Sequence, residues 1–188
     1  MDTKVFLKTY LNDFSDLVKP NENIIDQLEK IAYHLKTTRQ DGKKILIFGN
    51  GGSAAIASHF SVDLTKNAGL RCFNCNEADL ITCFANDYGF ERWVEKAVDF
   101  YGDAGDLLIV ISSSGCSENM LNGIKAARNR NFKTIVTLSG FDPDNPLRQL
   151  GDINLWIDSK AYNFVENIHQ VWLLAIVDLI IGSREYSA

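Results

Sequence analysis

A glycine-rich segment follows the first strongly apolar run of the chain. In ILIFGNGGSAA, Gly49, Gly51 and Gly52 separate this run from residues with helical spacing, and Ser53 comes next. A strand, a small-residue turn and a helix in this order gather free backbone N–H groups and the positive end of a helix dipole, which suits an anion. Ser53 can cap the helix or donate to a ligand oxygen. A tight turn without a ligand is the alternative interpretation.

A second loop of the same kind is rich in hydroxyl groups. The apolar run 106–111 is followed by four serines around Gly115, and then by the start of a helical segment: Ser112, Ser113, Ser114 and Ser117. Hydroxyls and helix-terminal amides can bind phosphate without cationic side chains. The two loops therefore predict a phosphorylated ligand, and a serine-rich capping turn without a ligand is the alternative.

Two familiar nucleotide motifs fit these loops poorly. A Walker-A loop requires a lysine after its glycines, and none follows here. The dinucleotide fingerprint is formally met by Gly49, Gly51 and Ala54. However, its acidic ribose partner should lie about 20 residues further on, and the nearest candidate, Glu77, lies farther away. We therefore expect no nucleotide cofactor.

Continuous apolar runs predict the strands that position both loops. They alternate with helical segments and lie at 45–48, 106–111, 134–138 and 153–157, with a shorter candidate at 71–75. Such runs are typical of strands that are buried on both faces, and hence of a parallel sheet covered by helices. We predict an α/β fold in which residues 1–188 form one domain. Two leading helices occupy 1–40, and the α/β core with the C-terminal helix occupies 43–188.

Helical segments are expected at both ends of the chain. The first has apolar residues at near-helical spacing and ends at Pro20, and the second begins near Asn23. The stretch 161–183 is apolar on nearly all sides, which indicates that it is buried on several sides, including against another subunit. A single central core helix is the alternative.

Composition excludes several classes of function. The chain has 188 residues, 46% of them hydrophobic, with 19 Lys and Arg against 24 Asp and Glu. The resulting net charge of −5 argues against nucleic-acid binding. The N-terminus lacks a signal-peptide core, and Asp178 interrupts the longest apolar run, so we expect a cytoplasmic protein without a membrane span. Cys72 and Cys75 are expected to be buried reduced thiols, although their C-x-x-C spacing leaves a redox or metal role open.

Three motifs together resemble the sugar isomerase (SIS) family. They are GNGGSAA with HF at 59–60, ANDYGF at 85–90, and ISSSGCS at 111–117. The resemblance covers nearly the whole chain and is strongest to the SIS isomerases that act on phosphoheptoses. It implies a cytoplasmic homotetramer with sites at subunit interfaces, which interconverts sedoheptulose 7-phosphate and D-glycero-D-manno-heptose 7-phosphate for surface polysaccharide.

The resemblance also implies roles for individual residues. The serines of the second loop would bind the phosphate, and five residues would hold the sugar chain: Asn50, Gly51, Ser53, Asn86 and Asp87. In the family, a Glu from the first-site helix and a His from the final helix move the proton, and a nearby His and Gln help to bind zinc in several members. Here His59 matches that nearby His, and Asp63 replaces the Glu.

The final helix departs further from the family pattern. Glu166 stands at the Gln position, His169 matches the first family His, and Leu174 occupies the position of the catalytic His. Two hypotheses follow. In the first, His59, Asp63 and Glu166 converge and are the candidate ligands of a metal, with zinc as a possible cofactor. Asp63 and Glu166 then carry the catalysis, because carboxylates can act as bases when their pKa is raised. In the second, the protein binds a phosphosugar without catalysis, as a regulator or a partner-binding module. A solvated Glu166 and a structural His59 are the alternatives without function.

Overall fold

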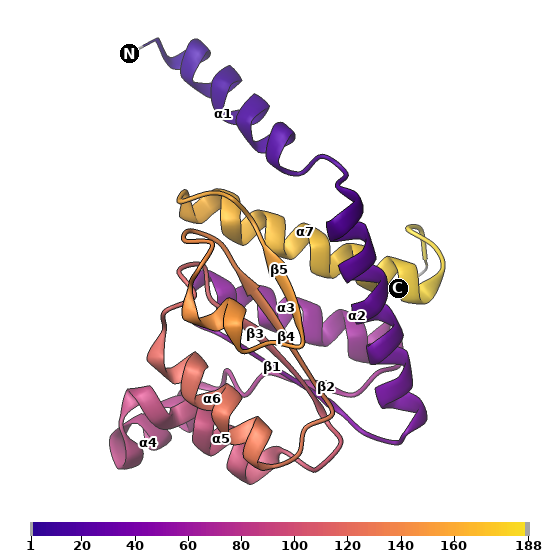
Figure 1. Cartoon of the computed structure of the whole chain (residues 1–188), viewed down its shortest axis with the longest axis vertical. Helices are drawn as coiled ribbons and strands as arrows, with labels where there is room; N and C mark the ends of the chain where they lie inside the picture. The colour runs from indigo at the N-terminus through magenta and orange to yellow at the C-terminus, as the bar shows by residue number, and fades with distance from the viewer. Residues whose placement is uncertain (1, 187–188) are drawn as a thin grey trace.

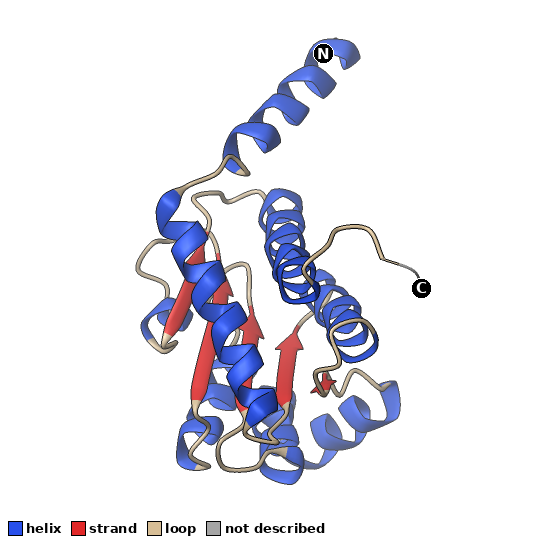
Figure 2. Ribbon diagram, turned by 90° about the vertical axis from the view of Figure 1, so that its right-hand side faces the viewer, coloured by secondary structure: helices blue, strands red, loops and turns tan. Residues whose placement is uncertain are grey.

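A parallel sheet forms the centre of the computed structural model, which describes residues 2–186. Its strands lie in the order β2-β1-β3-β4-β5 (Figure 2), and every pairing is parallel. Their bounds are β1 Ile45–Gly49, β2 Cys72–Phe73, β3 Leu107–Ile111, β4 Thr134–Ser139 and β5 Ile153–Trp156. All five predicted strands are confirmed, and β1, β3 and β4 are fully buried, as their continuous apolar sequences require.

Helices cover both faces of this sheet (Figure 1). One layer holds α2 (Glu22–Gln40), α3 (Gly52–Lys66) and α7 (Tyr162–Ile181), and the other holds α4 (Ala78–Tyr88), α5 (Trp93–Tyr101) and α6 (Glu118–Asn129). Alternate strand residues point to opposite layers, so that Ile47 joins one apolar cluster and Phe48 the other. Two short 3₁₀ helices, Phe90–Arg92 and Pro146–Gln149, complete the connections. The predicted α/β architecture is confirmed.

The first helix, α1 (Thr3–Leu17), extends away from the body of the molecule (Figure 1). The side chain of Asp2 caps its N-terminus by accepting from the backbone N–H groups of Lys4 and Val5. Tyr10 stacks edge-on against Phe164 of α7, with ring centroids 4.5 Å apart. Other apolar side chains of α1 are exposed to solvent: Val5, Phe6, Leu7 and Leu11.

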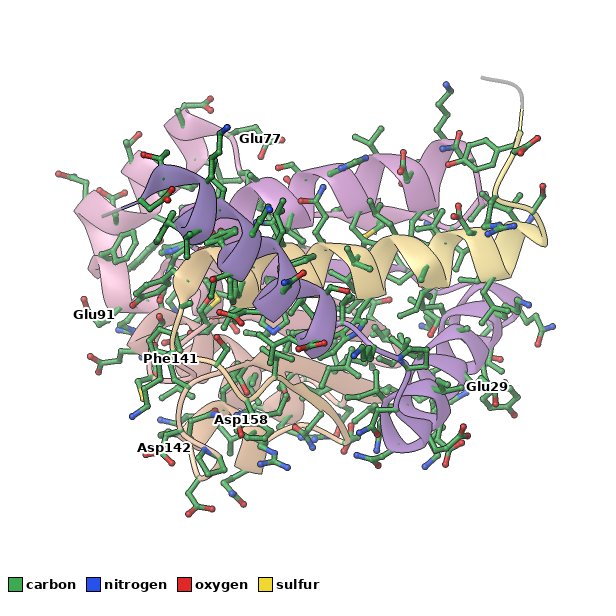
Figure 3. The ribbon with its side chains drawn as sticks, turned by 90° about the horizontal axis from the view of Figure 1, so that it is seen from above. Glu29, Glu77, Glu91, Phe141, Asp142 and Asp158 are labelled. Atoms are coloured by element: carbon green, nitrogen blue, oxygen red, sulfur yellow. The ribbon has the colours of Figure 1, made fainter. Side chains whose placement is uncertain are left out.

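The last helix, α7, lies beside α3, and α1 crosses over its amino-terminal part (Figure 3). Eight of its side chains are buried, whereas Val171 and Leu179 are 45% and 50% exposed. By length and composition alone, this helix could cross a membrane, although Asp178 interrupts its apolar run. Its buried apolar residues nevertheless belong to the cluster that covers one face of the sheet, as in a core helix of a globular domain.

The strand order places a crevice between β1 and β3. The chain leaves β1 towards β2 on one side and returns to β3 on the other, so that the connections after β1 and β3 diverge. In open parallel sheets, ligands bind at such a point, beyond the carboxyl ends of the strands. Both polar loops predicted as binding elements begin there, because β1 leads into α3 and β3 leads into α6.

Candidate functional site

A small cavity of about 200 Å³ lies at this crevice. It contains residues from both predicted loops and from the first turns of α7: Asn50, Ser53, Ile111, Ser112, Ser113, Ser114, Ser117, Tyr162 and Glu166. Six of the predicted substrate-binding residues are therefore together, and Gly51 precedes α3 next to Asn50 in the chain. Tyr162 was not expected from the sequence, because no motif distinguishes it from the apolar residues that follow.

The start of α3 presents its backbone amides without a side-chain cap. Gly51 is the N-cap residue with a φ of +55°, and no side chain caps the helix. Gly49 has no room for a Cβ, which would collide with the backbone of Ser53. The glycines thus fold the chain tightly and leave the positive end of the helix dipole facing the cavity.

The serine loop supplies a second uncapped helix terminus. Ser117 is the N-cap residue of α6, but its side chain does not cap the helix and instead accepts a hydrogen bond from Ser112 Oγ at 3.2 Å. The hydroxyl of Ser113 is buried and finds no hydrogen-bond partner among the described residues. Buried hydroxyls without partners are rare because they destabilise the fold. This hydroxyl is therefore free to donate to a ligand oxygen in the cavity.

A pair of amides joins the two loops. Asn50 Nδ2 donates to Asn119 Oδ1 at 3.1 Å, and Asn119 Nδ2 donates to Asn50 Oδ1 at 2.9 Å. Asn119 is 3% exposed and was missed by the sequence analysis. Its position at the start of α6 was a signal, but its partner is distant in sequence, so only the folded chain reveals the pairing.

Gly115 carries the sharp bend of the serine loop. Its φ is +68°, and a Cβ there would overlap the side-chain amide of Asn145. We expect Gly115→Ala to lower the free energy of unfolding by about 2 kcal/mol or more, through backbone strain and this collision, and to weaken phosphate binding. Urea unfolding and calorimetry with inorganic phosphate would measure both effects.

Gly42→Ala is the matched control for that variant. Gly42 also has a positive φ, +71°, but no heavy atom lies within 4 Å of its added Cβ. In Gly42→Ala, only backbone strain should lower the free energy of unfolding, by about 1–2 kcal/mol. This variant should bind phosphate as the unaltered protein does. Equal phosphate affinities for the two variants would show that the bend at Gly115 does not shape the site.

Glu166 of α7 lies against the first residue of α3. A Cβ on Gly52 would overlap the Glu166 carboxylate, so the acidic group sits directly at the N-terminal end of α3. The dipole of a helix stabilises a negative charge at this end. Next to it, Tyr162 stacks edge-on with Phe141 at 4.8 Å between ring centroids, and Figure 3 shows Phe141 in the loop near the start of α7.

The other predicted catalytic and metal residues lie elsewhere on α3. His59 Nε2 is 3.3 Å from Asp63 Oδ2, and Gln170 Nε2 of α7 lies 3.0 Å from His59 Nδ1. Asp63 Oδ1 also accepts a hydrogen bond from Asn67. Neither His59 nor Asp63 lines the cavity.

The expected convergence of His59, Asp63 and Glu166 is not found in one chain. Gly52, which Glu166 contacts, lies about two helical turns from His59. Among residues 2–186, no group of three His, Cys, Asp or Glu side chains could hold a metal ion. Leu174 cannot supply a ligand, and Gln170 already engages His59. The donor set of the single chain therefore does not fit a zinc site.

Asn86 and Asp87 are not brought into the cavity. They are exposed at the end of α4, where Asn86 Nδ2 donates to Asp87 Oδ1 at 2.9 Å. Their predicted contact with a sugar would require the ligand, or a neighbouring subunit, to extend across the carboxyl edge of the sheet.

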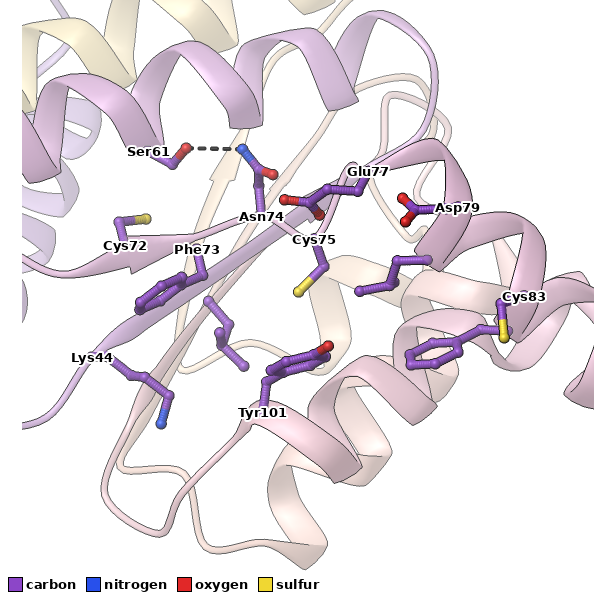
Figure 4. A pocket seen from close by; sticks show the side chains of 13 residues that line it. Lys44, Ser61, Cys72, Phe73, Asn74, Cys75, Glu77, Asp79, Cys83 and Tyr101 are labelled. Carbon is purple, nitrogen blue, oxygen red and sulfur yellow. Dashed lines mark hydrogen bonds between the residues drawn. The ribbon is translucent and has the colours of Figure 1, made fainter.

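A larger cavity of about 830 Å³ lies at the β2 edge of the sheet (Figure 4). Cys72, Cys75 and Cys83 line it, and none of the predicted site residues does. Cys72 and Cys75 are free and buried, as expected, and burial raises the pKa of Cys75 to about 11. The thiols are therefore poor nucleophiles. We place the functional site at the smaller cavity, where helix termini and hydroxyls converge.

His169, the residue at the first family His position, is fully buried and does not line the cavity. Its Nε2 lies 3.1 Å from the carbonyl oxygen of Ser139. Burial lowers its pKa to about 4 from an ordinary 6.5, and the hydrogen bond to Ser139 only partly offsets this. His169 is therefore neutral near pH 7 and is not a proton donor to a ligand.

This buried imidazole predicts a pH dependence of stability. The unfolded chain binds a proton at His169 below about pH 6.5, whereas the folded chain does so only near pH 4. As the pH falls between these values, proton binding to His169 in the unfolded chain lowers the free energy of unfolding. The loss reaches about 3 kcal/mol at pH 4. Urea unfolding at pH 7 and pH 4 should show this extra loss in the unaltered protein but not in His169→Leu. Parallel pH profiles for the two proteins would contradict the prediction.

Comparisons with known proteins agree with the fold and identify the family. Residues 9–139 match the family model described as "SIS domain". The phosphoheptose isomerase of Aliarcobacter butzleri is 35% identical over 180 residues, which cover 93% of this chain and 94% of that protein. That of Fusobacterium nucleatum is 35% identical over 179 residues, covering 92% and 91%.

Solved structures show the same arrangement. The phosphoheptose isomerase of Neisseria gonorrhoeae superposes with a TM-score of 0.87 at 28% identity, covering 94% of this chain and 98% of that one. The phosphoheptose isomerase of Francisella tularensis gives a TM-score of 0.84 over 97% of this chain and 100% of that one. At 24% identity, this second match shows the fold alone.

Proposed function

Because the chain belongs to the SIS domain family and, within it, to the phosphoheptose isomerases, we propose that it interconverts sedoheptulose 7-phosphate and D-glycero-D-manno-heptose 7-phosphate, which supplies heptose for surface polysaccharide. The observation that carries the proposal is the buried hydroxyl of Ser113 without a partner. It lies in a cavity at which two uncapped helix N-termini meet.

The serine loop binds the phosphate in this proposal. The hydroxyls of Ser113 and Ser114 and the first amides of α6 donate to its oxygens, and the helix dipole favours the negative charge. Within residues 2–186, no lysine or arginine lines the cavity, so the binding energy comes from hydrogen bonds rather than ion pairs. The sugar chain then extends towards Asn50, Ser53 and Glu166.

Glu166 is the base that the geometry favours. The isomerisation removes a proton from C1 of the ketose, forms a C1–C2 enediolate, and returns a proton to C2. A proton also moves from the C1 hydroxyl to the C2 oxygen, so that the carbonyl group moves from C2 to C1. Among the residues that the structure describes, Glu166 is the one carboxylate that lines the cavity. Ser53 and the amides at the start of α3 lie beside it and can donate to the enediolate oxygens.

Neither Asp63 nor zinc has a catalytic role within the single chain in this proposal. The His59–Asp63 pair lies outside the cavity of the single chain, and its donor set does not fit zinc. We therefore derive no step through a metal. Asp63 contributes only if a neighbouring subunit brings its carboxylate to a shared site.

A cytoplasmic homotetramer is also part of the proposal. Exposed apolar residues on α1, together with Val62 of α3 and Val171 of α7, form surfaces that association would bury. Free cysteines are usual in a reducing compartment. Light scattering should give the mass of four chains, and a monomer at micromolar concentration would contradict this.

Turnover of sedoheptulose 7-phosphate by the purified protein is the direct test. We expect aldose formation that survives chelation and is not increased by added zinc. Zinc-dependent turnover would overturn the assignment to Glu166 without a metal. Binding without turnover would favour the second candidate function, a phosphosugar-binding regulator, which Leu174 at the family's catalytic His position supports.

A further inference from the structure

We infer that His169 is a positioning residue that holds α7, with its catalytic carboxylate, at a set distance from the phosphate-binding serine loop. The inference rests on the proposed function, because it concerns the same cavity, but it assigns a role to a residue that does not line it.

The first contact joins α7 to the end of β4. His169 Nε2 donates to the carbonyl oxygen of Ser139 over 3.1 Å, and the same oxygen accepts the backbone N–H of Ile157. His169 lies three residues after Glu166, so both belong to one turn of the helix. A shift of α7 at His169 would therefore move Glu166.

The second contact joins Gly140, the residue after Ser139, to the serine loop. The backbone N–H of Gly140 donates to the carbonyl oxygen of Ser113 at 2.9 Å. A Cβ on Gly140 would collide with Val165 of α7, so the helix packs directly on this residue. Ser139 and Gly140 thus connect the helix that carries Glu166 with the loop that carries the free hydroxyl of Ser113.

Stability does not account for an imidazole at this position. Because Nε2 carries the proton, Nδ1 is an acceptor, and it is buried without a partner in the part of the chain that the structure describes. Such an acceptor destabilises the fold, whereas an apolar side chain in its place would not. His169 packs beside Trp172 in apolar surroundings that suit leucine as well as histidine.

Three variants test the inference. His169→Leu removes the donor, His169→Gln keeps an N–H near the position of Nε2, and Ile176→Ala, two turns further along α7, removes packing only. For His169→Leu we expect an unchanged or higher Tm and a Kd for sedoheptulose 7-phosphate at least tenfold higher. The Kd for inorganic phosphate should change less than threefold, because the serine loop itself binds that anion. His169→Gln should restore sugar-phosphate affinity to within threefold, and Ile176→Ala should lower Tm alone.

Several results would overturn the inference. One is an unchanged sugar-phosphate affinity in His169→Leu, and another is an equal loss of that affinity in the leucine and glutamine variants. Failure of His169→Leu to fold would also overturn it, since no net stabilising role is assigned to the imidazole. Amide exchange needs no ligand and separates this inference from the proposed function. The Gly140 amide should exchange at least tenfold faster in His169→Leu and recover in His169→Gln, even if the unaltered protein neither turns over nor binds a sugar phosphate.

Discussion

Glu166→Gln is expected to lower kcat for sedoheptulose 7-phosphate by about 10³-fold, while Kd for the sugar phosphate changes by less than about threefold. The amide keeps the shape of the carboxylate against Gly52 but cannot accept the C1 proton, and a positioned general base contributes about 10²–10⁴-fold. Steady-state kinetics and calorimetry on the same preparation would measure the two quantities.

Asp63→Asn is the matched control for this variant. It makes the same chemical change in the other predicted carboxylate, which lies 3.3 Å from His59 and outside the cavity. We expect kcat to fall by less than about tenfold, since general-base catalysis rests with Glu166. A large loss in Asp63→Asn with little loss in Glu166→Gln would move the base to Asp63, and would indicate a site completed by a second subunit.

Ser113→Ala is expected to weaken the binding of inorganic phosphate and of sugar phosphate by about 10–100-fold. A hydrogen bond to a charged group contributes about 1.5–3 kcal/mol, and the Ser113 hydroxyl has no partner within the described chain. Because this hydroxyl makes no hydrogen bond within the described chain, the substitution removes none from the fold. Its free energy of unfolding should therefore be unchanged or slightly higher.

Ser61→Ala should behave in the opposite way. Ser61 is also buried, but its hydroxyl donates to the Ser58 carbonyl and accepts from Asn74. We expect a loss of about 1–3 kcal/mol in stability and an unchanged phosphate affinity. Urea unfolding and phosphate titration of both variants would contradict the phosphate assignment if Ser113→Ala lost stability and kept its affinity.

Local sequence determined most of the fold of this protein. Apolar runs such as Leu107–Ile111 predict buried parallel strands because any other environment would expose them to water, and each became a strand. The glycines after β1 and the serines after β3 predict helix N-termini suited to an anion for a similarly local reason, since strand, loop and helix are consecutive. These residues line or border one cavity because parallel strands end at one edge.

The tertiary structure alone decided which side chains meet across that edge. Residues four apart in a helix, such as His59 and Asp63, share one face, but this spacing does not show that Gln170, rather than Glu166, faces His59. Nor could it show the pairing of Asn50 with Asn119 or the contact of His169 with Ser139. Such contacts join residues far apart in sequence and depend on how each helix is rotated and shifted on the sheet. That placement is set by the packing of the whole core, which no local pattern encodes.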